Sequence, residues 1–190
     1  MGSSSILEFA TTAEIEIDAS CQEVWHKIHD VENFSSTFRG VYIASVIGDP
    51  CKVGSRRRIT RLTRGHCFSA VWSLVRYDED SRPFPRTCKF YSEDFVGSNR
   101  AVASTTWTVT PTDDSNRCLV TISLAISPRN YFLVIGRLVF APFMKKLARK
   151  SVEEDLEDLA AACTINSKFA KSEKTESTAI LNEDDIILMQ

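Results

Sequence analysis

Two histidines on a predicted helix are the first groups whose spacing could support chemistry. His26 and His29 lie three residues apart, with Asp30 beside the second, and this spacing places two imidazoles on one helical face. A protein metal centre needs at least a third ligand, and none is evident in the sequence. We therefore interpret the pair as exposed or half-buried helix histidines, and we expect neither a metal nor a cofactor.

The sequence also lacks the motifs of nucleophilic and nucleotide chemistry. No G-x-S-x-G, P-loop or G-x-G-x-x-G occurs, and no cysteine has an obvious histidine partner. Glu93 and Asp94 follow Tyr91, and strand alternation would turn one of the two carboxylates inward. We favour a solvent-facing or salt-bridged pair, so no catalytic residue is assigned.

An arginine-rich run falls on one predicted strand, with Arg56, Arg57, Arg58, Arg61 and Arg64 close together. Alternation puts Arg56 and Arg58 on one face, and Arg57 and Arg61 on the other. If the first set faces inward, Arg58 could anchor a ligand carboxylate or phosphate by a bidentate contact. The alternative is that these arginines lie on the outer face or pair with acidic residues of the first strand.

Aromatic side chains provide a second group of candidate binding residues. Phe68 and Trp72 share one strand face, Phe90 is the inward candidate of the next strand, and Trp107 shares a face with Thr105. Ligand sites are mainly apolar, with a few convergent polar groups. The same residues could also fill a solid core.

The elements that would position these side chains begin with a strand and a capped helix. Residues 12–18 alternate strictly between apolar and polar, which predicts a half-buried strand. Ser20 followed by Glu23 is a capping-box pattern and predicts a helix from Cys21 to about His29. A short turn or helix is expected at 32–38. Six more strands are predicted at 41–47, 55–63, 66–77, 86–95, 100–110 and 117–127.

Beyond Pro128 the apolar residues follow a helical period. They recur at three- and four-residue steps at Phe140, Met144, Leu147, Ala148, Val152, Leu156, Leu159, Ala160 and Cys163. A helix of about 22 residues starting at Pro142 would run roughly 33 Å, enough to cross a sheet. Strands joined by short connections favour an antiparallel meander. One helix cannot fill the space inside a bent sheet of seven strands, so we expect a cavity.

The bulk composition indicates one ordinary globular domain. The 190 residues are 43% hydrophobic and 25% charged, with a formal net charge of −2. This balance gives no case for nucleic-acid binding. The six cysteines are scattered singly and no secretory leader is apparent, so we predict reduced thiols and a cytoplasmic location.

Three segments resemble the START-like, SRPBCC superfamily, and within it the polyketide cyclase/dehydrase and lipid transport proteins. AEIEIDASCQEVW (13–25) is similar to the opening strand and its "P/S-x-x-x-V-W/F" helix, VGSRRRI (53–59) to "VG-x-x-R", and ASTTWTVTPTDDSNRCLV (103–120) to the "W-x-V-x-P-x-x-x-x-T-R-V" hairpin. The resemblance spans roughly 12–164. It implies an α+β helix-grip fold, in which a curved seven-stranded antiparallel sheet wraps around a long C-terminal helix. It also implies binding of hydrophobic or amphipathic small molecules. The family often has a Glu in the strand that here reads FSAVWSL (68–74), and this chain has none.

Together these observations predict a START-like ligand-binding domain at 12–165, a flexible N-terminus at 1–11 and a disordered polar and acidic tail at 166–190. The predicted function is non-catalytic binding or carriage of a lipid-, isoprenoid- or polyketide-like molecule. A cyclase/dehydratase-type enzyme using the same cavity is the alternative. The predicted ligand-binding residues are Phe38, Tyr42, Arg58, Phe68, Trp72, Phe90, Thr105, Trp107 and Phe140. A transient membrane contact through 131–143 is a third alternative, and the oligomeric state is left open.

Overall fold

The structure is a computed structural model of the chain, and it describes residues 9–63, 66–79, 81–93, 101–114, 116–128 and 145–164. The strands are β1 (Phe9–Ile17), β2 (Val41–Ile47), β3 (Arg56–Thr63), β4 (His66–Tyr77), β5 (Arg86–Ser92), β6 (Ala101–Pro111) and β7 (Cys118–Pro128). The helices are α1 (Cys21–His29), the 3₁₀ turn η1 (Val31–Asn33), α2 (Phe34–Thr37) and a C-terminal helix over 145–164. The order of elements is the one that the sequence predicted.

The seven strands form one antiparallel sheet in the order β1-β7-β6-β5-β4-β3-β2. Strands β2 to β7 are a simple meander, and β1 returns to pair with β7. The pairing of β1 with β7 extends from Phe9, opposite Ile126, to Ile17, opposite Cys118. The first strand thus begins three residues before its predicted start, and residues 9–11 belong to it rather than to a flexible N-terminus.

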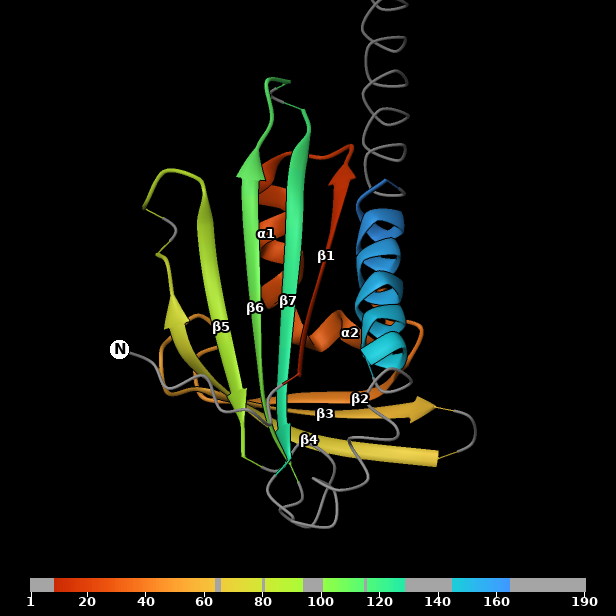
Figure 1. The fold of residues 1–190 in the computed structure, drawn as a ribbon. Coiled ribbons are helices and arrows are strands. Elements are labelled where there is room, and N and C mark those ends of the chain that lie inside the picture. Colours follow the sequence, from red (N-terminus) through yellow and green to blue (C-terminus); the bar gives the residue numbers. More distant parts are fainter. Residues whose placement is uncertain are drawn as a thin grey trace, which may run out of the picture.

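The sheet bends sharply along β4. The first part of this long strand pairs with β3, and the last part pairs with β5, so that Ser73 is opposite both Arg56 and Tyr91. The register with β5 shifts between Leu74 and Arg76, and such bulges bend a strand and increase its twist. As a result β2, β3 and β4 run across the direction of the other strands (Figure 1). The predicted curved α+β sheet is confirmed.

Helix α1 begins where the capping pattern predicted. The Ser20 hydroxyl accepts a hydrogen bond from the backbone N–H of Glu23 at 3.2 Å, which satisfies one of the free donors of the first turn. Its apolar face buries Val24, Trp25 and Ile28 in the core. The side chain of Trp25 donates from Nε1 to the Tyr77 hydroxyl at 3.4 Å, which connects α1 to the end of β4.

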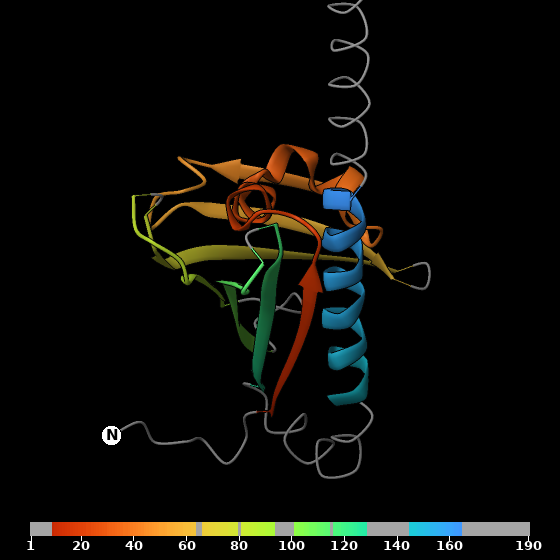
Figure 2. The same cartoon turned by 90° about the horizontal axis from the view of Figure 1, so that it is seen from above.

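The C-terminal helix lies alongside β1 (Figures 1 and 2). Four residues of the predicted stripe, Val152, Leu156, Leu159 and Cys163, lie within the core, whereas Leu147 is 37% exposed. Phe140 and the predicted interfacial segment at 131–143 lie outside the described residues, as does the predicted tail. In the described part of the chain, no helix combines the length and the apolar character needed to span a membrane.

Candidate functional site

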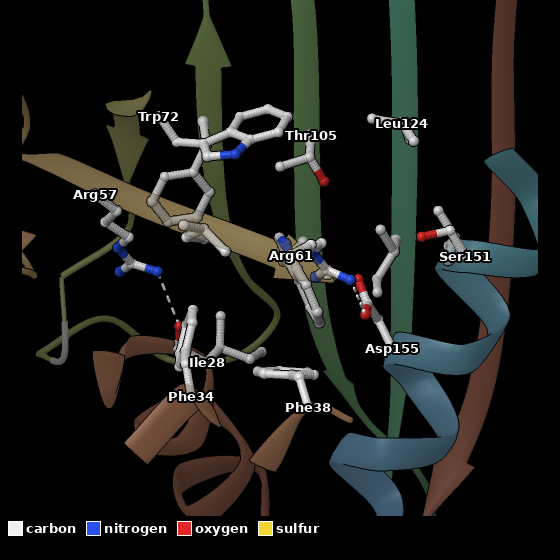
Figure 3. A pocket seen from close by; sticks show the side chains of 15 residues that line it. Ile28, Phe34, Phe38, Arg57, Arg61, Trp72, Thr105, Leu124, Ser151 and Asp155 are labelled. Atoms are coloured by element: carbon white, nitrogen blue, oxygen red, sulfur yellow. Dashed lines mark hydrogen bonds and ion pairs between the residues drawn. The ribbon is translucent and has the colours of Figure 1, made fainter. Parts of the chain in front are cut away.

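A cavity of about 140 Å³ lies between the curved sheet, the two N-terminal helices and the C-terminal helix (Figure 3). Its lining residues are Ile28, Phe34, Phe38, Arg57, Ile59, Arg61, Trp72, Phe90, Thr105, Trp107, Ile122, Leu124, Ser151, Val152 and Asp155. Most of these side chains are apolar. A dry cavity of roughly 150 Å³ is known to hold a benzene-sized molecule, so this one has room for a ring-sized apolar group.

Five of the predicted binding residues meet at this cavity, namely Phe38, Trp72, Phe90, Thr105 and Trp107. The sheet register explains part of this, because Phe90 is directly opposite Thr105 in the pairing of β5 with β6. The helical side contributes Phe38, whose ring centre lies 6.4 Å from that of Trp107 in an edge-to-face arrangement. This ring pair joins the short helix α2 to the sheet across the cavity.

Three other predicted residues lie outside the lining. Tyr42 is 64% exposed because it stands on the edge strand β2 at a register shift, between the core residues Val41 and Ala44. Phe68 is on the same face of β4 as Trp72 but lies four residues nearer the start of the strand. Its side chain is 44% exposed there. Arg58 is also exposed. Phe140, the ninth candidate, is outside the described residues.

The arginines at the cavity come from the opposite face of β3 to that of Arg58. Arg57 pairs in register with Trp72, whereas Arg58 is opposite Val71. The face that turns inward therefore carries Arg57 and Arg61, and the exposed position of Arg58 corresponds to the outer-face alternative. The assignment of an anchoring role to Arg58 is corrected accordingly.

Arg57 is a buried cation. Its side chain is 2% exposed, and its Nη1 and Nη2 groups donate to the carbonyl oxygens of Ile28 at 3.0 Å and Pro50 at 3.2 Å. The guanidinium carbon lies 4.2 Å from the ring centre of Phe90, a cation–π distance. Burial lowers the pKa of Arg57 to about 10, so the group is still charged at neutral pH.

Arg61 is held quite differently, by a carboxylate on the C-terminal helix. Its Nη1 and Nη2 groups each donate to one oxygen of Asp155, both at 2.8 Å, in the bidentate geometry that suits a guanidinium and a carboxylate. Burial opposes the charge, but the attraction and hydrogen bonds of Asp155, together with Asp158 and Glu154, raise the pKa of Arg61 above its usual value. Burial raises the pKa of Asp155 despite its contacts with Arg61, but the two parallel hydrogen bonds are those of a guanidinium with a carboxylate, so the pair is ionic.

The sequence reasoning missed Asp155 as a lining residue, although a signal was present. Asp155 stands three residues after Val152 and just before Leu156, both of which are buried. A carboxylate on the edge of an apolar stripe must meet a partner as the helix docks. Ile28, Phe34, Ile59, Ile122, Leu124 and Ser151 were also missed, because nothing local marks them as lining residues rather than core.

The other titratable candidates do not meet at the cavity. His29 is buried in the core and its Nδ1 lies 2.8 Å from the carbonyl oxygen of Trp25, so that nitrogen carries the proton. Glu93 is exposed, and Asp94 lies outside the described residues. Within the described ranges, no three or more His, Cys, Asp or Glu side chains are grouped as metal ligands.

Comparison with known families now decides the classification. The family model described as polyketide cyclase / dehydrase and lipid transport matches residues 8–164. The chain belongs to this family. The match spans both sides of the cavity, from β1 to the end of the C-terminal helix. No curated protein matches the sequence.

Solved structures share the fold of this chain. A START superfamily protein from Mycobacterium smegmatis is 13% identical, with 82% of this chain and 97% of that chain covered and a TM-score of 0.64. The Zhui aromatase/cyclase from Streptomyces sp. R1128 is 12% identical, with 83% of this chain and 94% of that chain covered and a TM-score of 0.63. Norcoclaurine synthase from Thalictrum flavum is 16% identical, with 82% of this chain and 86% of that chain covered and a TM-score of 0.55. At these identities the likeness establishes the START-like fold, and the family supports a hydrophobic ligand-binding fold.

Proposed function

We propose that this protein binds and carries a hydrophobic small molecule in its internal cavity without changing it chemically. The observation that carries the proposal is the cavity itself, which is enclosed by the bent sheet and by helices on the other side. Trp72, Trp107 and Phe38 provide aromatic walls, and burial of an apolar ligand surface against such walls is favourable by about 25 cal/mol per Å². A ring-sized apolar part of a lipid-, isoprenoid- or polyketide-like molecule fits this space.

The polar groups of the described lining favour binding over proton transfer. Asp155 is the one carboxylate among the described lining residues, and both of its oxygens accept hydrogen bonds from Arg61. A general base needs a lone pair within reach of the substrate proton, and the bidentate contact holds both oxygens of this carboxylate against the Arg61 guanidinium. The strand 68–74 supplies no glutamate. These features support a carrier.

Native mass spectrometry of the protein purified from its own cells tests the proposal. We expect a bound small molecule, to be identified by extraction and fragmentation. Ser151 lines the cavity from the C-terminal helix, so Ser151→Phe should fill the space and abolish the adduct. Lys146 is exposed on the same helix, so Lys146→Phe is a matched control that should retain it. Equal adduct occupancy in Ser151→Phe, or no adduct in the wild type, would contradict the proposal.

The enzyme alternative can be tested on the same sample. The extracted ligand is returned to fresh protein and recovered after prolonged incubation. A carrier returns it with unchanged mass, whereas a cyclase/dehydratase yields a product that has lost water.

A further inference from the structure

The charge of Arg57 has no counter-ion among the residues that the structure describes. No carboxylate of the described residues lies within ion-pair distance of its guanidinium, which is held by two carbonyl oxygens and aromatic rings. Burial of a charge away from water is costly unless the charge is paired. The low pKa of Arg57, about 10, reflects this cost.

Arg57 also has hydrogen-bonding capacity to spare. A guanidinium has five N–H donors, and the contacts with Ile28 and Pro50 use one on Nη1 and one on Nη2. The buried Nε has no hydrogen-bond partner in the described part of the chain. Since nearly all buried donors in proteins are satisfied, this pattern leaves the group with capacity for an acceptor beyond the described residues.

The charges of the described lining do not balance. Arg61 and Asp155 neutralise each other through their two hydrogen bonds. Arg57 therefore leaves one positive charge at the opposite end of the cavity from that pair (Figure 3). A ligand with a single negative charge would restore neutrality in a space where water cannot screen it.

We propose that the ligand is an amphipathic anion, whose carboxylate or phosphate group pairs with Arg57 while its apolar body lies against Trp72, Phe38 and Trp107. This inference rests on the proposed function and adds the chemical class of the ligand. Thr105 lines the cavity from β6, opposite Phe90 of β5. Its hydroxyl makes no hydrogen bond to the described residues. We expect that hydroxyl to donate to a polar atom of the ligand.

Three probes that share one ring system and differ in charge test the proposal. They are 2-naphthoate, 2-naphthyl phosphate and the neutral 2-naphthalenemethanol, and each can be titrated by calorimetry or by quenching of the cavity tryptophans. We expect at least one of the two anions to bind tenfold or more tightly than the alcohol. The better of the two identifies the headgroup as a carboxylate or a phosphate. An alcohol that binds as tightly as both anions would overturn the inference.

Three variants assign the effect to Arg57. Arg57→Met should weaken the preferred anion at least tenfold and leave the alcohol within about threefold. Arg57→Lys should restore part of the anion affinity, because it keeps the charge but not the fork of donors. Arg58→Met, on the exposed face of the same strand, should match the wild type for every probe. If Arg57→Met binds the anions with wild-type affinity, the inference fails.

The outcomes separate this inference from the proposed function. If all three probes bind alike, the cavity is a ligand site and only the charge preference is wrong. If no probe binds the wild type and no adduct is found in native mass spectrometry, the proposed function fails together with the inference. The comparison among probes on the wild-type protein does not depend on whether Arg57→Met folds.

Discussion

Arg61 on β3 and Asp155 on the C-terminal helix share two parallel hydrogen bonds of 2.8 Å across 94 residues of sequence. Both residues line the cavity, so the same contact that docks the helix also forms part of the binding site. A second contact lies one turn further along the helix, where Asp158 accepts hydrogen bonds from the backbone and side chain of Arg39. The wall of the cavity is therefore fixed by charge as well as by its apolar stripe.

The Arg61–Asp155 pair is predicted to stabilise the fold. Asp155→Asn keeps the shape of the side chain but leaves the partly buried Arg61 without its counter-charge, which should lower the free energy of unfolding by about 2–4 kcal/mol. Urea denaturation measures this. Glu153→Gln, which breaks the exposed pair with Arg149, is the control and should cost less than about 0.5 kcal/mol. Equal effects of the two substitutions would contradict the predicted role.

Three buried thiols are predicted to be unreactive in the native protein. Burial raises the pKa of Cys88, Cys118 and Cys163 to about 12, so that at pH 8 only about one in 10,000 of each is a thiolate. Iodoacetamide should label the exposed Cys67 first and these three only on unfolding, as peptide mass spectrometry can determine. Rapid native labelling of Cys88 would disprove the packing described here.

The same thiols predict how stability depends on pH. Their pKa is higher in the folded state than the value of 9.0 expected in the unfolded chain, so the unfolded state loses these protons first as the pH rises. Their contribution to the free energy of unfolding should be constant below about pH 8 and should fall between about 9 and 12. Replacement of Cys88 by Ala should make that decline shallower in urea titrations at several pH values.

The Thr105 hydroxyl is predicted to serve the ligand rather than the fold. Thr105→Val keeps the branched shape and removes a hydroxyl that has no hydrogen-bond partner in the described part of the chain, so the free energy of unfolding should change by less than about 0.5 kcal/mol. Affinity for the preferred naphthyl anion should fall several-fold. Thr87→Val, which removes a hydroxyl 3.3 Å from that of Thr108, should instead lower stability by about 1 kcal/mol and leave affinity unchanged.

The ionisation of Arg57 predicts a pH limit for anion binding. Because its pKa is lowered to about 10, the guanidinium is charged at neutral pH and loses its proton as the pH rises through that value. Affinity for 2-naphthoate should be flat between about pH 6 and 9 and should fall about fourfold by pH 10.5. The neutral alcohol should show no such fall, with circular dichroism confirming that the protein stays folded. A matching decline for both probes would indicate unfolding instead of deprotonation.

The strands and helices could be predicted closely because their signals are local. Each of the main signals depends on neighbours a few residues away. They are the capping pattern at Ser20, the alternation in 117–127 and the apolar stripe around Leu156. The predicted start of β2 and both ends of α1 agree with the structure. The start of β1 and the end of β5, at Ser92, differ from the prediction by three residues. The first residues of β1 are defined by pairing with β7, more than 100 residues later in the chain.

The sequence by itself determined that β3 has two faces, each with its own arginines, and that an apolar-striped helix must cover the sheet. Only the tertiary structure decided which face turns inward, because alternation is symmetric and the register against β4 breaks the symmetry by placing Arg57 opposite Trp72. Contacts between distant segments, such as Phe38 with Trp107 and Arg61 with Asp155, were likewise decided by the bend of the sheet and the docking of the helix. The spacing of residues along the sequence does not indicate either contact.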